Sequence, residues 1–119
     1  MSQTKILIIE DQSKIASFLK QGLEENGYYT QVIHDNNTDV IKAIKNAFDL
    51  VILDLNISFV NGHSMSRKIK EASLVPVLML TSQTVNTFEN AIDRLVIPFP
   101  FDDLLKKVNI LLNKVGNMC

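Results

Sequence analysis

The stretch Leu50-Val51-Ile52-Leu53-Asp54 is an apolar run that ends in a single carboxylate. A short apolar run bounded by polar residues is typical of a strand buried on both faces, as in a parallel sheet. The interior of such a strand gains nothing from an aspartate. At the carboxyl end, where open α/β sheets place their ligand crevice, an aspartate is a candidate site residue.

Two further apolar runs also end in polar residues. Ile6–Ile9 is followed by Glu10-Asp11, and Val77–Leu80 is followed by Thr81-Ser82. Because parallel strands end at the same edge of a sheet, we expect the three acidic groups and two hydroxyls to meet there. This edge is the candidate functional site.

Between the apolar runs, apolar residues recur at the spacing of amphipathic helices. The first of these helices is followed by Gly27, which is suited to a helix C-cap, and the run 28–33 is more polar and therefore expected nearer a sheet edge. The segment 84–91 can hold about two helical turns at most. The expected strands span 5–10, 28–33, 49–54, 77–80 and 94–97, and the expected helices span 12–26, 38–47, 63–71, 84–91 and the residues after Pro100, with 56–61 as a loop and Gly62 as a turn residue.

The order of elements is therefore a strand followed by a helix, repeated five times, which predicts an α/β fold with a parallel sheet covered on both faces. A length of 119 residues without a linker or repeat predicts one domain over 1–119. The net charge of −1 argues against nucleic-acid binding by this segment. A lone cysteine, Cys119, and the lack of a signal peptide or membrane span lead us to expect a cytoplasmic protein without a membrane partner.

Three carboxylates at one edge repel one another, so we expect at least one pKa to rise unless a cation is present. Magnesium fits such a site best, because it uses one or two carboxylates and recruits phosphate oxygens. The alternative is that each acid only caps the following helix, as Asp11 could do for 12–26. Three acids, with two hydroxyls beside them, gathered on three apolar strand ends favour the site over the caps.

The chain resembles the receiver domain of two-component response regulators. The resemblance covers the whole chain and rests on the joint order and spacing of Ile9-Glu10-Asp11, Leu53-Asp54-Leu55, Gly62, Leu80-Thr81-Ser82 and Pro98-Phe99. It implies a (βα)5 flavodoxin-like fold, a doubly wound sheet of five parallel strands. The residues 9–15 and 22–28 are most similar to receivers that precede a winged-helix DNA-binding domain, so DNA contact is expected only through an output domain that residues 1–119 do not contain.

This resemblance also implies a chemistry. Asp54 would accept a phosphoryl group from a phosphohistidine on a sensor histidine kinase. Asp11 and Asp54, with the backbone carbonyl of Asn56, would hold Mg²⁺, and Glu10 would act mainly through a metal-bound water. Thr81 would hydrogen-bond a phosphoryl oxygen and move toward it after transfer. The domain would phosphorylate itself and would not otherwise be an enzyme.

Some positions depart from the family pattern. The lysine before the Pro-Phe pair is replaced by Ile97, the switch aromatic three residues earlier by Arg94, and the proline four residues after the acceptor by Ser58. The segment 81–91 is shorter than usual, which predicts a shortened fourth helix. Ser58 predicts a more mobile loop, since a proline would restrict the chain. The resemblance also implies a cis Ile97-Pro98 bond.

These departures leave other functions open. A degenerate receiver could act as a phosphorylation-independent interaction or dimerisation module. In either case a homodimer could form through the face of the fourth helix, fifth strand and last helix. A flavodoxin-like enzyme or nucleotide-binding protein is disfavoured, because Glu10-Asp11-Gln12-Ser13 is acidic and lacks the glycines of a phosphate cradle.

Overall fold

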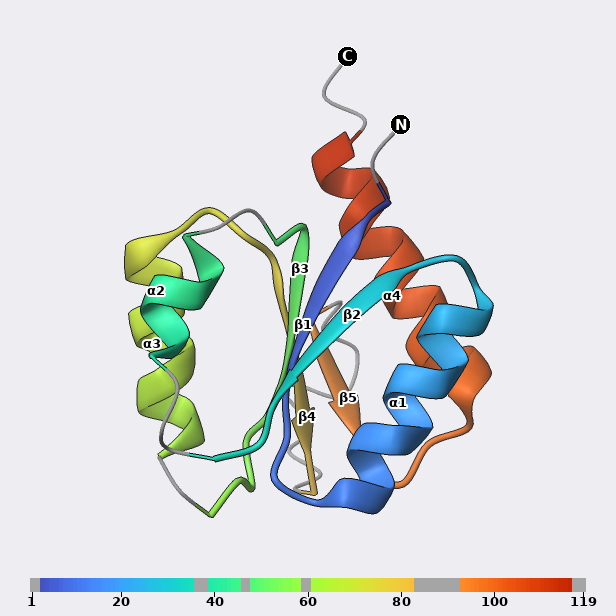
Figure 1. Cartoon of the computed structure of the whole chain (residues 1–119), viewed down its shortest axis with the longest axis horizontal. Helices are drawn as coiled ribbons and strands as arrows, with labels where there is room; N and C mark the ends of the chain where they lie inside the picture. The colour runs from blue at the N-terminus through green and yellow to red at the C-terminus, as the bar shows by residue number, and fades with distance from the viewer. Residues whose placement is uncertain (1–2, 36–38, 46–47, 59–60, 83–92, 117–119) are drawn as a thin grey trace.

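A single parallel sheet of five strands lies between two layers of helices in the computed structural model of the chain (Figure 1). The structure describes residues 3–35, 39–45, 48–58, 61–82 and 93–116, without the side chains of 114–116. The elements follow in the order β1 (Lys5–Ile9), α1 (Ser13–Glu25), β2 (Tyr29–Ile33), α2 (Val40–Ile44), β3 (Leu50–Asp54), α3 (Gly62–Ala72), β4 (Val77–Thr81), β5 (Arg94–Val96) and α4 (Phe101–Gly116).

The strand order is β2-β1-β3-β4-β5, so the chain reverses its direction of winding between β1 and β3. This order confirms the flavodoxin-like fold, and the more polar β2 lies at an edge as expected. The predicted short helix over 84–91 lies outside the described residues. In open sheets of this kind, ligands bind beside the carboxyl ends of the strands at the reversal point.

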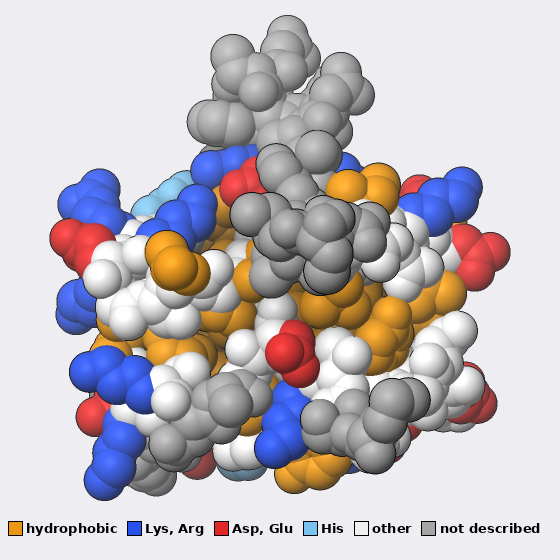
Figure 2. All heavy atoms as spheres, turned by 90° about the horizontal axis from the view of Figure 1, so that it is seen from above, with side chains coloured by type: hydrophobic (Ala, Val, Ile, Leu, Met, Phe, Trp, Pro, Cys, Tyr) orange, Lys and Arg blue, Asp and Glu red, His pale blue; other side chains and the backbone are white. Residues whose placement is uncertain are grey.

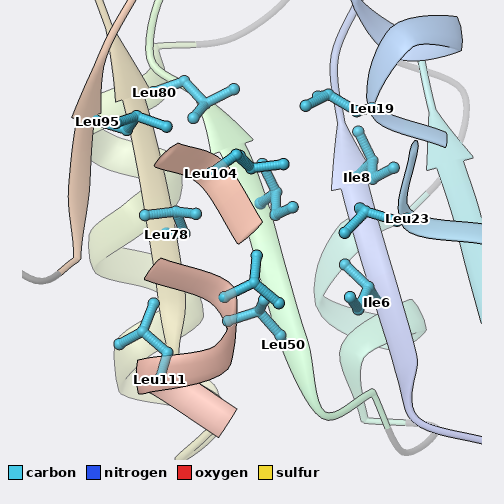
Figure 3. Close-up of a cluster of buried hydrophobic side chains, with 12 residues drawn as sticks. Ile6, Ile8, Leu19, Leu23, Leu50, Leu78, Leu80, Leu95, Leu104 and Leu111 are labelled. Atoms are coloured by element: carbon cyan, nitrogen blue, oxygen red, sulfur yellow. The ribbon is translucent and has the colours of Figure 1, made fainter. Parts of the chain in front are cut away.

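Alternating side chains of the strands supply two hydrophobic cores, one on each face of the sheet. Helices α1 and α4 cover one face, and α2 and α3 cover the other (Figure 1). In the first core, strand residues such as Ile8 and Leu78 meet Leu19 and Leu23 of α1 and Leu104 of α4 (Figure 3). Burial on both faces explains why β3 and β4 read as continuous apolar runs.

Helix α1 ends in a Schellman motif built around Gly27. The N–H of Tyr28 donates to the carbonyl of Leu23 (3.1 Å), and the N–H of Gly27 donates to that of Glu24 (3.0 Å). Gly27 has a φ of +90°, a conformation that side chains rarely adopt. The expected C-terminal glycine is therefore confirmed, and the motif turns the chain directly into β2.

Helix α2 is shorter than the predicted span of 38–47. The side chain of Asp39 accepts a hydrogen bond from the N–H of Lys42 (3.1 Å), so Asp39 is the N-cap and the helix begins at Val40. It ends at Ile44, and residues 46–47 lie outside the described part of the chain. The helix therefore begins two residues later than the predicted start at 38.

Gly62 is not a turn residue, as the sequence suggested, but the first residue of α3. Asn61 caps the helix, since its side chain accepts hydrogen bonds from the N–H groups of His63 (2.9 Å) and Ser64 (3.1 Å). A Cβ atom at Gly62 would lie 2.6 Å from both the Cα and the carbonyl oxygen of Leu55. Glycine is therefore needed for the close approach of α3 to the backbone just beyond Asp54.

A hollow with a volume of about 510 Å³ lies at the end of the molecule where the strands begin, away from the carboxyl ends of the strands. Hydrophobic side chains show at this end, with acidic and basic side chains between them near the middle and further charged groups toward the rim (Figure 2). Among the lining residues, Leu74 is fully exposed and Phe48 is half-buried. Of the helices that the structure describes, none combines the length and apolar character needed to cross a membrane.

We predict that Gly62→Ala destabilises the fold by about 1–3 kcal/mol, the usual cost of forcing a methyl group into a packed site. Urea denaturation would measure the change. In an open helical position, alanine stabilises a helix relative to glycine by about 1 kcal/mol. A loss of stability in Gly62→Ala would therefore indicate a clash. Ser64→Ala, on the exposed side of the same helix turn, is the control and should change little; a stabilised Gly62→Ala variant would contradict the close approach.

Candidate functional site

Strand pairing brings the predicted site residues to one edge of the sheet. Ile9 pairs with Leu53, and Asp54 pairs with Leu80, so the residues that follow β1 and β4 lie beside the end of β3. Glu10, Asp54 and Thr81 retain only 0%, 3% and 7% of their exposure. Three polar side chains are thus buried together at the reversal point of the sheet, where the sequence placed them.

Glu10 is the most strongly perturbed acid of this edge. Burial raises the pKa of its carboxyl to about 8, helped by a hydrogen bond to Asp54 and by the negative charges of Asp54 and Asp11. Its Oε1 accepts the backbone N–H of Gln12 (3.0 Å), whereas its buried Oε2 has no donor. The expected rise of one carboxyl pKa is therefore found at Glu10.

Asp11 is held by Ser58, which lies four residues beyond Asp54 in the loop between β3 and α3. Its Oδ2 accepts the backbone N–H of Ser58 (2.9 Å) and also the Ser58 hydroxyl. The hydroxyl bond is the main reason why the pKa of Asp11 lies below its usual value. The second oxygen, Oδ1, is buried and has no hydrogen-bond partner.

The capping alternative is wrong for Asp11. Gln12 is the N-cap of α1, and no side chain caps this helix in the usual way. The carboxylate of Asp11 is bound to Ser58, and it is Glu10 that accepts the N–H of Gln12. Of the two acids after β1, Glu10 therefore binds the backbone at the start of α1, whereas Asp11 binds Ser58 in the loop after β3.

The loop after β3 is tied to both neighbouring strands. The backbone N–H of Asn56 donates to Asp54 Oδ1 (2.8 Å), and the Asn56 side-chain amide donates to Ser82 Oγ just beyond β4 (3.0 Å). The Ser58 bonds to Asp11 add a third tie, just beyond β1. The loop is thereby fixed to the ends of three strands.

Ile97 presents an apolar surface at the position of the family lysine. Its side chain packs against the first core, as do those of Phe99 and Phe101, and its N–H donates to the carbonyl of Thr81 (2.8 Å). Arg94 lies three residues earlier, opposite Met79 and on the other face of the strand from Ile97. The Ile97-Pro98 bond is cis, as the resemblance implied.

The donor set at this edge fits a hard cation. Among the described residues, no three His, Cys, Asp or Glu side chains form a ready ligand cluster. Magnesium needs only one or two carboxylates, with carbonyl and water oxygens completing its shell. The buried Glu10 Oε2 and Asp11 Oδ1 accept no hydrogen bond from a described group, and they are the oxygens that a cation would stabilise.

Sequence reasoning missed the contacts of Ser58 and Ser82. Ser58 was considered only as a missing proline, and its partner Asp11 lies 47 residues away in the chain. Ser82 and Asn56 are separated by 26 residues. No periodicity or local motif links such pairs, so only the fold brings them together.

We predict that metal-free protein loses stability as the pH rises from about 4.5 to about 8. In this window the folded state keeps a proton on Glu10 that the unfolded chain releases. The corresponding stability is fully present below pH 4.5 and is lost as the pH passes the folded-state value, at about 1.4 kcal/mol for each pKa unit.

Thermal unfolding across this range would measure the decline. Glu10→Gln should flatten it, whereas Glu25→Gln, on an exposed part of α1, should leave it in place. An unchanged decline in the Glu10→Gln variant would show that another group carries the pH dependence.

Comparison with known proteins gives one consistent family. A model of the response regulator receiver domain matches residues 6–109. The response regulator ArlR of Staphylococcus saprophyticus is 30% identical over 118 residues, a match that covers 93% of this chain and 53% of the relative. The chain therefore spans about half the length of the curated relatives that it matches.

Solved structures agree in fold. A two-component response regulator from Clostridium difficile has a TM-score of 0.82 at 28% identity, over 95% of this chain and 98% of the other. The receiver domain of Francisella response regulator 1452 has a TM-score of 0.79 at 30% identity, over 95% and 99%. With acidic residues buried at the strand ends and a family model matched over most of its length, the chain belongs to the response regulator receiver domains of two-component signalling.

Proposed function

We propose that Asp54 is the phosphoacceptor of this receiver domain. The observation that carries the proposal is the placement of Asp54, buried at the end of β3 beside Glu10, with one carboxylate oxygen held by the N–H of Asn56. In the transfer, an Asp54 oxygen forms a bond to phosphorus as the phosphorus–nitrogen bond of a phosphohistidine breaks. The electron pair of that bond returns to the imidazole nitrogen, and Asp54 becomes an acyl phosphate.

We propose that Asp11, Asp54 and the backbone carbonyl of Asn56 hold Mg²⁺, with Glu10 beside them. A bound divalent cation offsets negative charge on the transferring group. The low pKa of Asp11 keeps its carboxylate ionised at neutral pH, which suits a ligand. The N–H of Asn56 orients Asp54 through Oδ1.

Thr81 is proposed to contact a phosphoryl oxygen from the end of β4, where it lies next to Leu80, the partner of Asp54. A charge-assisted bond from a lysine is missing at Ile97, and such a bond is worth about 1.5–3 kcal/mol. The switch from Thr81 to an aromatic side chain is also missing, since Arg94 occupies that position. We therefore propose that Asp54 is phosphorylated, but that the resulting conformational change does not use the family's coupling of the threonine to an aromatic side chain.

Family membership favours the phosphoacceptor over the phosphorylation-independent module. The proposed donor is a sensor histidine kinase. We also propose a homodimer through the face of the expected fourth helix, β5 and α4; the expected fourth helix lies outside the described residues. Contact with DNA is proposed only through an output domain.

Beryllofluoride, a phosphoryl mimic, tests the assignment in ¹H–¹⁵N NMR spectra. With Mg²⁺ present, we expect shifts of the amide signals of Asp54, Asn56 and Thr81. Asp54→Asn should abolish the response to beryllofluoride, because the amide cannot bind the beryllium as a carboxylate does. If the wild-type signals stay in place at saturating mimic, Asp54 is not the acceptor.

A further inference from the structure

The contact between Ser58 and Asp11 joins two loops that are 47 residues apart in the chain. Both donors of Ser58, its N–H and its hydroxyl, are directed at the same oxygen, Oδ2 of Asp11. The other oxygen, Oδ1, is buried without a hydrogen-bond partner. One side of the carboxylate is therefore saturated, and the other is left open within the acidic edge.

We infer that Ser58 is a positioning residue that holds Asp11 with Oδ1 available to a divalent cation. This inference rests on the proposed Mg²⁺ site. Carboxylate ligands of metal ions are themselves commonly hydrogen-bonded by outer-shell groups, and loss of such a partner typically costs 10–100-fold in metal affinity. Ser58 supplies this support without using the oxygen that the cation needs.

The effect of Ser58 reaches beyond Asp11 because of the loop that carries it. Asn56, two residues earlier, binds Asp54 through its N–H and Ser82 through its side chain. A proline at position 58, as in the family pattern, has neither an N–H nor a hydroxyl to donate. The tie between this loop and Asp11 therefore depends on the departure from the family residue.

The alternative is that Ser58 weakens the binding of the cation. If the cation required Oδ2 of Asp11, the two Ser58 bonds would compete with it, and removal of the hydroxyl would strengthen metal binding. The direction of the affinity change thus separates support from competition.

The experiment is calorimetric titration of the 119-residue protein with Mg²⁺ alone. We expect Ser58→Ala, which removes the hydroxyl but keeps the N–H, to weaken binding about tenfold. Ser58→Thr keeps the hydroxyl and should bind Mg²⁺ within about twofold of the wild type. Ser64→Ala, an exposed serine in the first turn of α3, is the matched control and should leave the affinity unchanged.

Thermal unfolding in metal-free buffer checks that each variant is folded, and the Asp11 amide signal in NMR spectra reports the carboxylate contact directly. Equal or tighter Mg²⁺ binding by Ser58→Ala would overturn the inference while leaving the proposed metal site intact. Absence of Mg²⁺ binding by the wild type would overturn the proposed metal site and, with it, the inference. A weakened Ser58→Thr variant would show that bulk at position 58, and not the hydroxyl, sets the affinity.

Discussion

The burial of carboxylates at one edge of the sheet is the constraint on which this structure depends. Glu10 and Asp54 are almost completely removed from water, and Asp11 lies beside them. Burial of like charges is costly, and a protein can relieve the cost by retaining a proton, by donating hydrogen bonds or by binding a cation. Here Glu10 takes the first route and Asp11 the second. The third route is the one that the proposed function would use.

The sheet enforces this crowding. β1 and β3 are neighbours in one parallel ladder, buried on both faces, so their carboxyl ends cannot move apart without breaking the pairing and both cores. Gly62 brings α3 against the backbone just beyond β3 and limits the room for the loop. The packing of the two hydrophobic cores thus holds the acids close together and sets the geometry of the site.

Much of the fold could be predicted, because apolar runs with polar ends and a glycine with a positive φ leave local signals. The run Leu50–Asp54 is a strand with the predicted end, and Gly27 closes α1. The start of α2 was less predictable, since several neighbouring polar residues could cap it and the structure uses Asp39. Within the site, the strand-end acids followed from topology. The bonds of Ser58 and Asn56 did not, because they join loops whose sequences contain no shared pattern.

The two ends of the described chain lie away from the acidic edge. β1 begins and α4 finishes on the side where the strands start, at the opposite pole from Glu10 and Asp54 (Figure 1). An affinity handle or a fluorophore attached near Gln3 would therefore stand roughly a strand's length from the chemistry, about 17 Å for five residues. Protein immobilised through a group near Gln3 would expose the edge that carries Glu10 and Asp54 to the solution. Binding measurements on a surface would therefore leave this edge accessible.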